Sequence, residues 1–133
     1  MKKHGILNSH ISKILSDLGH TDTIVIADVG LPIPKDVPRI DLALKLGVPS
    51  FEDVVNIIAE DIVIEKIIVA EELEENNTET SQFINAQFKE IEIKRVSHEQ
   101  FKNLTQHAKV IIRTGEAKPY ANCILQSGVN FGK

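Results

Sequence analysis

The sequence predicts an α/β fold: a single domain over residues 1–133 in which helices flank a largely parallel, Rossmann-like central sheet. Two short runs, 23–27 and 62–70, are dominated by Ile and Val, which is typical of strands buried on both faces. Strand-like and helix-like segments alternate along the chain with Pro or Gly at the joints, a pattern that favours α/β. With 42% hydrophobic residues among 133, the chain can build one full core.

The first third of the chain is expected to form a helix, a strand and a stiff loop. Residues 7–18 carry apolar side chains at helical spacing and end at a glycine, and Asn8 or Ser9 can cap the helix start. The apolar run 23–27 is the first strand. The three prolines of residues 30–38 predict an extended loop that lacks a full set of amide donors.

The middle of the chain is expected to add two strands and a helix. Residues 39–46 alternate with a β-compatible bias until Pro49 stops the pattern. Ser50 and Asp53 read as a capping box for a helix that follows. The run 62–70 is the second strongly apolar segment and is expected to be a central strand.

The last part of the chain repeats the alternation. The acidic stretch 71–75 is expected to be a solvated link without a function, leading into a helix that carries Phe83, Ile84 and Phe88. A strand at 91–96 precedes a helix that Ser97 caps and His98 begins. Three further segments follow: a strand at 110–113, a polar loop at 114–119 and a last strand at 121–125.

Composition limits the classes of function. A net charge of −4 and a pI near 5.7 give no basic surface for nucleic acid or for an anionic membrane. The single Cys123 excludes an internal disulfide and a cysteine-built zinc site, which fits a reducing compartment. The first ten residues lack the apolar core of a signal peptide, and no apolar run has the length of a membrane span. We therefore expect a cytoplasmic location.

Familiar catalytic motifs are missing. The sequence contains no GxGxxG after a strand, no GxxxxGK(S/T), no GxSxG and no HExxH. Nucleotide binding, lipase-like hydrolysis and zinc protease chemistry therefore lose most of their support. Cys123 follows Asn122 within an apolar segment, where it more simply fills space. The remaining histidine, aspartate, tyrosine and amide groups suit a neutral, polyhydroxylated ligand.

The segment 19–34 (GHTDTIVIADVGLPIP) places two candidate groups at the ends of the first strand. His20 lies in the turn before the strand, and Asp28 lies at its carboxyl end, where open α/β sheets usually bind ligands. Asp28 also fits a plain turn or cap ahead of Gly30. Because a strand of this length spans roughly 20 Å, the two side chains of one subunit should not touch if the strand is fully extended. A site that uses both His20 and Asp28 therefore requires one of three things. The strand is shorter than predicted, the chain folds back, or a second subunit completes the site.

Three separated motifs carry a resemblance to a known family: the segment 19–34, the pair Ser97-His98, and the triplet Tyr120-Ala121-Asn122. Together they resemble the D-ribose pyranases, the ribose branch of a sugar mutarotase family that also includes the L-fucose mutarotases. The resemblance extends over the whole chain in length and in the order of motifs. The sequence GLPIP at 30–34 is closer to the ribose branch than to the fucose branch.

The resemblance implies an isomerase of ribose catabolism that interconverts the β-pyranose and β-furanose forms of D-ribose, without a metal or an organic cofactor. Its acid/base histidine falls on His20, and its sugar-binding positions fall on Asp28, His98, Tyr120, Ala121 and Asn122. It also implies a ring-shaped homo-oligomer, a decamer of two pentamers, with each site between neighbouring subunits. Two alternatives remain open: a non-catalytic ribose-binding or transport-accessory protein, and an L-fucose mutarotase.

Overall fold

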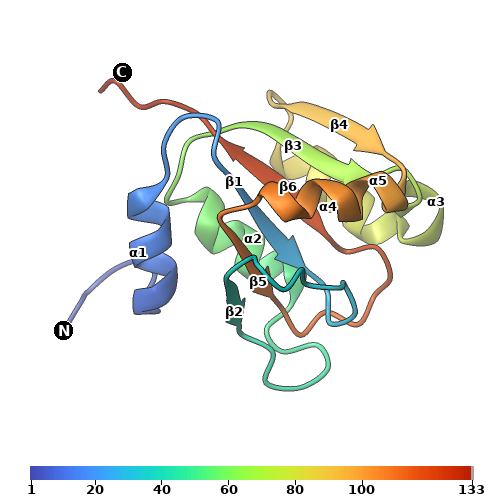
Figure 1. Ribbon diagram of the computed structural model, residues 1–133, viewed down its shortest axis with the longest axis horizontal. Helices are drawn as coiled ribbons and strands as arrows, with labels where there is room; N and C mark the ends of the chain where they lie inside the picture. Colours follow the sequence, from blue (N-terminus) through green and yellow to red (C-terminus); the bar gives the residue numbers. More distant parts are fainter. Residues whose placement is uncertain (133) are drawn as a thin grey trace.

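The computed structural model describes residues 1–132, and within them six strands form one sheet in the order β2-β5-β1-β6-β3-β4 (Figure 1). The strands are β1 Thr23–Ala27, β2 Arg39–Asp41, β3 Ile64–Ala70, β4 Glu92–Val96, β5 Val110–Arg113 and β6 Cys123–Ser127. β6 is antiparallel to both of its neighbours, β1 and β3, whereas the other pairs are parallel. The α/β class is confirmed, but the sheet is mixed.

The direction of β6 follows from the short connection before it. Residues 114–122 join β5 to β6 without a helix, and a parallel crossover needs about a dozen residues or more. β6 therefore enters the sheet in the opposite direction, between β1 and β3. The resulting strand order also differs from that of the classic dinucleotide fold, so the Rossmann-like expectation is wrong in this respect.

The helices of the described chain are α1 Ser9–Asp17, α2 Phe51–Ala59, α3 Leu73–Asn76, α4 Thr78–Gln87, α5 His98–Leu104 and the 3₁₀ turn η1 Thr105–His107. All of them except α3 and η1 begin at a side-chain cap. Asn8, Ser50 and Ser97 accept hydrogen bonds from backbone N–H groups in the first turns of α1, α2 and α5, which satisfies donors that helix geometry leaves free. The caps predicted at Ser50 and Ser97 are confirmed.

The helices cover both faces of the sheet, unevenly. One apolar cluster joins α1, α2, α3 and α4 to alternate residues of the strands, such as Ile24 and Ile26 of β1. A smaller cluster joins α5 and the loop after β1 to the other face, through residues such as Val25 and Phe101. Figure 1 shows α5 in front of the sheet and α2 behind it. The alternation along β1 is the period-two pattern of a strand buried on both faces.

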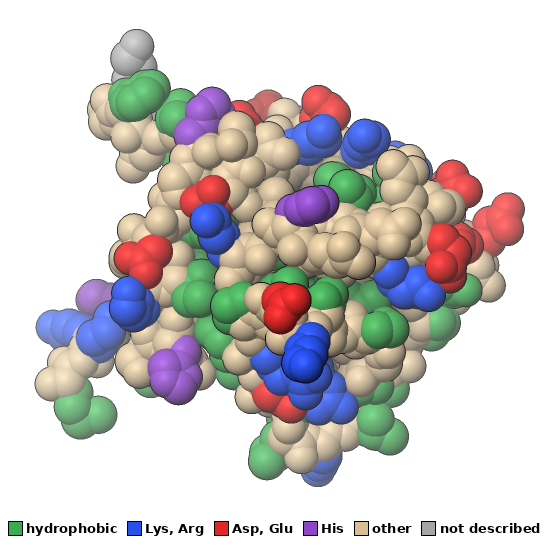
Figure 2. All heavy atoms as spheres, in the orientation of Figure 1, with side chains coloured by type: hydrophobic (Ala, Val, Ile, Leu, Met, Phe, Trp, Pro, Cys, Tyr) green, Lys and Arg blue, Asp and Glu red, His purple; other side chains and the backbone are tan. Residues whose placement is uncertain are grey.

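Three predicted segments differ in detail. The strand expected at 39–46 ends at Asp41, and the last strand begins at Cys123 rather than at Ala121. The acidic stretch 71–75 includes the start of the short helix α3, whose Leu73 is buried. On the face shown in Figure 2, acidic side chains gather at the right edge, over α3.

The sheet direction sets where functional groups can meet. The carboxyl ends of five strands and the amino end of β6 lie along one edge. Residues after β1 and β4 and residues before β6 therefore converge there, whereas the turn before β1 lies at the opposite edge. Within residues 1–132, no helix combines the length and the apolar character needed to cross a membrane.

Candidate functional site

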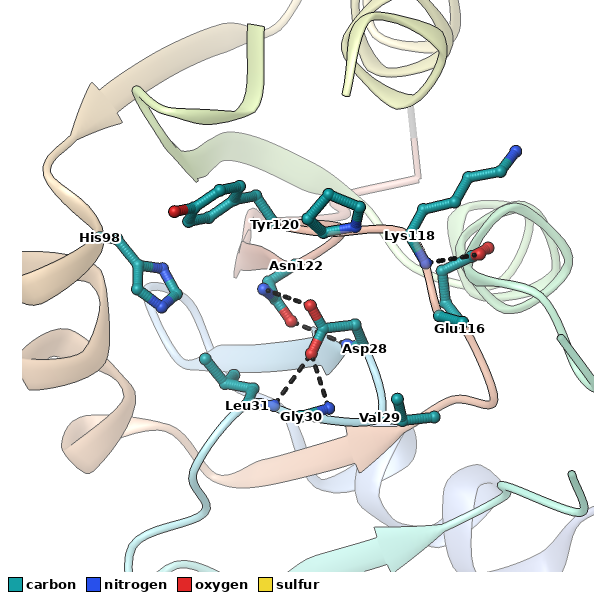
Figure 3. A pocket seen from close by; sticks show the side chains of 11 residues that line it. Asp28, Val29, Gly30, Leu31, His98, Glu116, Lys118, Tyr120 and Asn122 are labelled. Atoms are coloured by element: carbon teal, nitrogen blue, oxygen red, sulfur yellow. Dashed lines mark hydrogen bonds between the residues drawn. The ribbon is translucent and has the colours of Figure 1, made fainter. Parts of the chain in front are cut away.

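A pocket of about 330 Å³ opens at the edge where Asp28 follows β1 (Figure 3). This volume is at the small end of the range for ligand pockets, roughly 300–1,000 Å³, and suits a small molecule. The lining comes from the loop after β1, the start of α5 and the segment before β6. It consists of Asp28, Val29, Gly30, Leu31, His98, Glu116, Ala117, Lys118, Pro119, Tyr120 and Asn122.

Asp28 is held by three donors at the end of β1. Its Oδ1 accepts hydrogen bonds from the N–H groups of Gly30 and Leu31, both at 2.9 Å, and its Oδ2 accepts one from Nδ2 of Asn122 at 3.2 Å. Burial raises the pKa of the Asp28 carboxyl above its usual 3.8, although these three hydrogen bonds and the nearby His98 act in the opposite direction. The turn role expected for Asp28 and its place in the pocket are therefore both present.

Asn122 is the buried partner of Asp28, with only 2% of its surface exposed. Besides donating to the carboxylate, it accepts the backbone N–H of Asp28 on Oδ1 at 2.7 Å. An amide suits this place because it donates and accepts at once, whereas a carboxylate only accepts. Figure 3 shows the two residues pointing toward each other, with both hydrogen bonds drawn as dashed lines.

His98 enters the pocket from the first position of α5. Its backbone N–H donates to both carboxylate oxygens of Glu72, at 3.0 and 3.1 Å, so one residue of the acidic stretch has a structural role that we did not expect. The ring stacks on Phe101 and meets Tyr120 edge-on, with ring centres 6.4 and 5.1 Å apart. Among the described residues, Nδ1 of His98 is the buried side-chain polar atom without a hydrogen-bond partner, and it is free to bond a ligand.

Tyr120 has an unusual backbone conformation. Its φ is 57°, in the left-handed region that residues other than glycine rarely adopt. Its carbonyl accepts the N–H of Asn122 at 2.8 Å, which turns the chain sharply before β6. This turn explains why β6 begins two residues later than predicted, and it presents the Tyr120 ring to the pocket while Asn122 reaches Asp28.

Glu116 is a pocket residue that was not predicted from the sequence. It is 9% exposed, and its carboxylate accepts the N–H of Phe51 at 3.1 Å and the N–H of Lys118 at 3.3 Å. Phe51 begins α2, so this negative charge lies at a helix amino terminus, where it is stabilised. The position of Glu116 just after a buried strand was the signal that could have identified it. Lys118 extends away from Asp28 in Figure 3, and its ammonium pairs with Glu79 at 2.6 Å.

Two candidate residues lie outside the pocket lining. His20 lies before β1, at the opposite edge of the sheet, where its Nε2 is 3.0 Å from Oε1 and 3.1 Å from Oε2 of Glu65. β1 has the five residues predicted for it, or roughly 17 Å of extended chain, so a shorter strand does not bring His20 to Asp28. Ala121 is fully buried in the apolar core beside Cys123, so its side chain is not available to a ligand.

The residues of the site suit hydroxyl recognition. Within residues 1–132, no group of three or more His, Cys, Asp or Glu side chains is arranged to hold a metal ion. The pocket combines a carboxylate, an amide, an imidazole nitrogen and an aromatic ring. Carboxylate and amide groups hydrogen-bond hydroxyls, and an aromatic ring covers the apolar face of a sugar, so the arrangement fits a small, neutral polyol.

Comparisons with known proteins agree with this chemistry. The sequence model of the RbsD / FucU transport protein family matches residues 1–130. The D-ribose pyranase of Bacillus licheniformis is 59% identical over 131 residues, which are 98% of this chain and 100% of the relative. That of Bacillus cytotoxicus is 60% identical over the same shares of the two chains.

Solved structures extend the similarity to three dimensions. Bacillus subtilis RbsD complexed with D-ribose has a TM-score of 0.96 and 59% identity, and the alignment covers 98% of this chain and 100% of that one. The fucose mutarotase of Streptococcus pneumoniae in complex with L-fucose has a TM-score of 0.75 at 22% identity, over 93% of this chain and 94% of the other. The second likeness shows the fold alone. With a family model that spans residues 1–130 and full-length relatives at 59–60% identity, the chain belongs to the RbsD / FucU family.

Proposed function

We propose that this protein is an isomerase that interconverts the β-pyranose and β-furanose forms of D-ribose. The observation that carries this function is its likeness to Bacillus subtilis RbsD, which is 59% identical over its full length and whose structure is a complex with D-ribose. The pocket also offers a carboxylate, an amide and an imidazole nitrogen, which can hydrogen-bond the hydroxyls of ribose. The full-length relatives named D-ribose pyranase support the same activity.

The chemistry needs one proton donor and acceptor near the anomeric carbon. Ring opening delivers a proton to the ring oxygen while the anomeric hydroxyl loses one, so that the C–O bond breaks and an aldehyde forms. Reclosure through another hydroxyl reverses both transfers and gives the other ring size. His20 shuttles these protons, a step usually worth about 10² to 10⁴ in rate. No net oxidation occurs, and all atoms of the sugar are retained.

The pocket residues hold the sugar while the ring exchanges. The Asp28 carboxylate accepts sugar hydroxyls, and the buried Nδ1 of His98 bonds a further one. Asn122 keeps Asp28 oriented through their two mutual hydrogen bonds. The Tyr120 ring covers an apolar face of the sugar. Of Ala121, only the backbone can take part, since its side chain is buried in the core. Fixing the sugar in this way lets either hydroxyl approach the carbonyl carbon without a large entropic cost.

A second copy of the chain supplies the histidine. His20 and Asp28 lie at opposite ends of β1, so a site that uses both is formed where the His20 edge of one subunit meets the Asp28 edge of another. Such a head-to-tail contact closes into a ring when the rotation allows it. A decamer of two pentamers, which the family resemblance implies, satisfies this requirement. Its cytoplasmic location stays a prediction.

A non-catalytic role is the competing proposal, because the family model is described as a transport protein family. A binding or transport-accessory protein would use the same pocket groups. Fucose is the less favoured sugar, since the likeness to fucose mutarotase is at 22% identity.

Saturation-transfer NMR at the anomeric protons tests the activity directly. The protein should accelerate pyranose–furanose exchange of D-ribose, whereas His20→Ala, folded and assembled, should not. L-Fucose under the same conditions serves as the second substrate. Ribose binding without acceleration of exchange would favour the transport-accessory role. Faster exchange of L-fucose than of D-ribose would indicate an L-fucose mutarotase.

A further inference from the structure

Asn77 is a buried asparagine that contacts the pocket loop from outside the pocket. It lies between α3 and α4, and only 7% of its surface is exposed. Both ends of its amide are bonded: Oδ1 accepts the N–H of Thr80 at 3.2 Å, and Nδ2 donates to the carbonyl of Pro119 at 2.9 Å. The first bond caps α4. The second reaches 42 residues along the chain to the residue before Tyr120.

The Pro119 carbonyl belongs to the peptide group from which Tyr120 starts. Tyr120 is held at a φ of 57°, a conformation that persists in a non-glycine residue only when its surroundings enforce it. On the far side, the Tyr120 carbonyl accepts the N–H of Asn122 at 2.8 Å. The strained residue therefore has one hydrogen bond on each side, and the Asn77 side chain donates the first of them.

A second contact links the same two segments but is weaker in kind. Lys118 and Glu79 form an ion pair at 2.6 Å, with about half or more of each side chain exposed. Exposed pairs of this sort contribute little and are screened by salt. Asn77 is shielded from solvent, so its hydrogen bond to Pro119 is the more durable restraint on the loop.

We propose that Asn77 is a positioning residue for sugar binding: its amide holds the Pro119 carbonyl and so keeps Tyr120, together with Asn122, in the conformation that the pocket requires. The inference deepens the proposed function and rests on it where sugar affinity is concerned. The two ends of the Asn77 amide have different roles. The oxygen caps α4, and the nitrogen holds the Pro119 carbonyl beside the pocket.

Two variants remove the nitrogen and keep the cap. Asn77→Ser is uncharged and too short to reach Pro119, and Asn77→Asp has the size of asparagine without the donor; serine and aspartate are both good helix caps. Asn76→Asp is the matched control. It makes the same charge change one residue earlier, where the asparagine is exposed and its Nδ2 donates to the Glu72 carbonyl within α3 at 2.8 Å.

The readouts are the ribose dissociation constant from calorimetry, the thermal midpoint, and the near-ultraviolet circular dichroism of tyrosine. The chain has one Tyr and no Trp, so the tyrosine band reports Tyr120 alone. We expect both Asn77 variants to weaken ribose binding by roughly 2- to 10-fold, the effect of one lost hydrogen bond, and to change the Tyr120 band. Asn76→Asp should match wild type in both.

Wild-type affinity and an unchanged tyrosine band in Asn77→Ser would overturn the inference. So would an equal loss of affinity in Asn76→Asp. If wild type itself binds no ribose, the proposed function fails, but the tyrosine band still decides whether Asn77 holds Tyr120.

Discussion

Asp28 and Asn122 exchange two hydrogen bonds, one in each direction. The backbone N–H of Asp28 donates to Oδ1 of Asn122 at 2.7 Å, and Nδ2 of Asn122 donates to Oδ2 of Asp28 at 3.2 Å. The bonds join the end of β1 to the segment before β6, 94 residues apart in sequence. They fix the carboxylate in the pocket and fix the start of the antiparallel strand, so one pair serves both binding and folding.

Asn122→Asp should weaken both ribose binding and the stability of the fold. It removes the amide donor and places a second carboxylate against Asp28 in a buried site. We expect the free energy of unfolding to fall by about 1–3 kcal/mol, the penalty for an unsatisfied buried polar group, and ribose affinity to fall at least about tenfold with it. Urea titration and calorimetry measure the two effects. Asn130→Asp, an exposed position near the end of the chain, is the control. Wild-type stability and affinity in Asn122→Asp would mean that the two hydrogen bonds between Asp28 and Asn122 contribute neither to folding stability nor to ribose binding.

The pKa of Asp28 predicts a dependence of stability on pH. Burial raises this pKa above 3.8, so the folded chain binds the Asp28 proton more tightly than the unfolded chain does. By linkage, the resulting stabilisation is complete below the unfolded value and is lost as the pH rises through the folded value. The substituted side chain in Asp28→Asn cannot ionise, so this variant does not lose that stabilisation as the pH rises. The thermal midpoint of Asp28→Asn relative to wild type should therefore rise between pH 3.8 and neutrality.

The measurement is a pair of thermal unfolding series, wild type and Asp28→Asn, over the same buffers. The absolute difference at one pH includes the hydrogen bond that Asn122 loses, so only the trend with pH is diagnostic. A difference that stays constant, or that falls as the pH rises, would contradict the raised pKa.

Glu65 should assist His20. Its carboxylate contacts Nε2 of the imidazole at 3.0 Å and accepts Nε2–H of Gln126 at 3.0 Å; these contacts, Gln126 first, lower the pKa of Glu65. Holding one ring nitrogen sets the tautomer and leaves Nδ1 for proton transfer. Because the pair is exposed, Glu65→Gln is expected to lower kcat by only about 2- to 5-fold.

KM should stay unchanged in Glu65→Gln, because His20 and Gln126, which hydrogen-bond the Glu65 carboxylate, do not belong to the lining of the pocket. Glu92→Gln makes the same substitution on the neighbouring strand β4, where the carboxylate lies 3.9 Å from Nζ of Lys66, and should leave both constants unchanged. An increase in KM with constant kcat would show that Glu65 does not act through His20.

Cys123 should be unreactive in the folded protein. Its side chain is fully buried at the start of β6, and burial raises its thiol pKa far above the usual 9.0, which suppresses the reactive thiolate. A thiol reagent should label the chain only after denaturation, and Cys123→Ala should keep ribose exchange. Rapid labelling of the native protein, or loss of exchange in a folded Cys123→Ala, would contradict this prediction and indicate that the thiol is a functional group.

Features that depend on nearby residues were predicted well from the sequence. The bounds of β1 follow from its own apolar run, the caps at Ser50 and Ser97 act within three residues, and Asp28 follows its strand directly. The separation of His20 from Asp28 followed from strand geometry alone.

Features that depend on distant contacts were not predicted. β6 lies between β1 and β3, and nothing local to residues 121–125 specifies those partners. Ala121 was grouped with Tyr120 and Asn122 by motif, yet the left-handed turn at Tyr120 directs its side chain into the core. Glu116 bonds Phe51, which is 65 residues away, so its pocket role appears only in the folded chain.

The most direct test of the account is ribose exchange by hybrid oligomers. His20→Ala and Asp28→Asn are each expected to abolish exchange alone. When they are unfolded together and reassembled in equal amounts, about one site in four should combine an intact Asp28 cluster with an intact His20 from another copy. Exchange should return to roughly a quarter of the wild-type rate. His20→Ala mixed with the double variant His20→Ala/Asp28→Asn is the control and should stay inactive, since no copy then carries an intact His20. If the first mixture forms hybrids and remains as inactive as its parents, His20 and Asp28 do not meet across subunits and the proposed site is wrong.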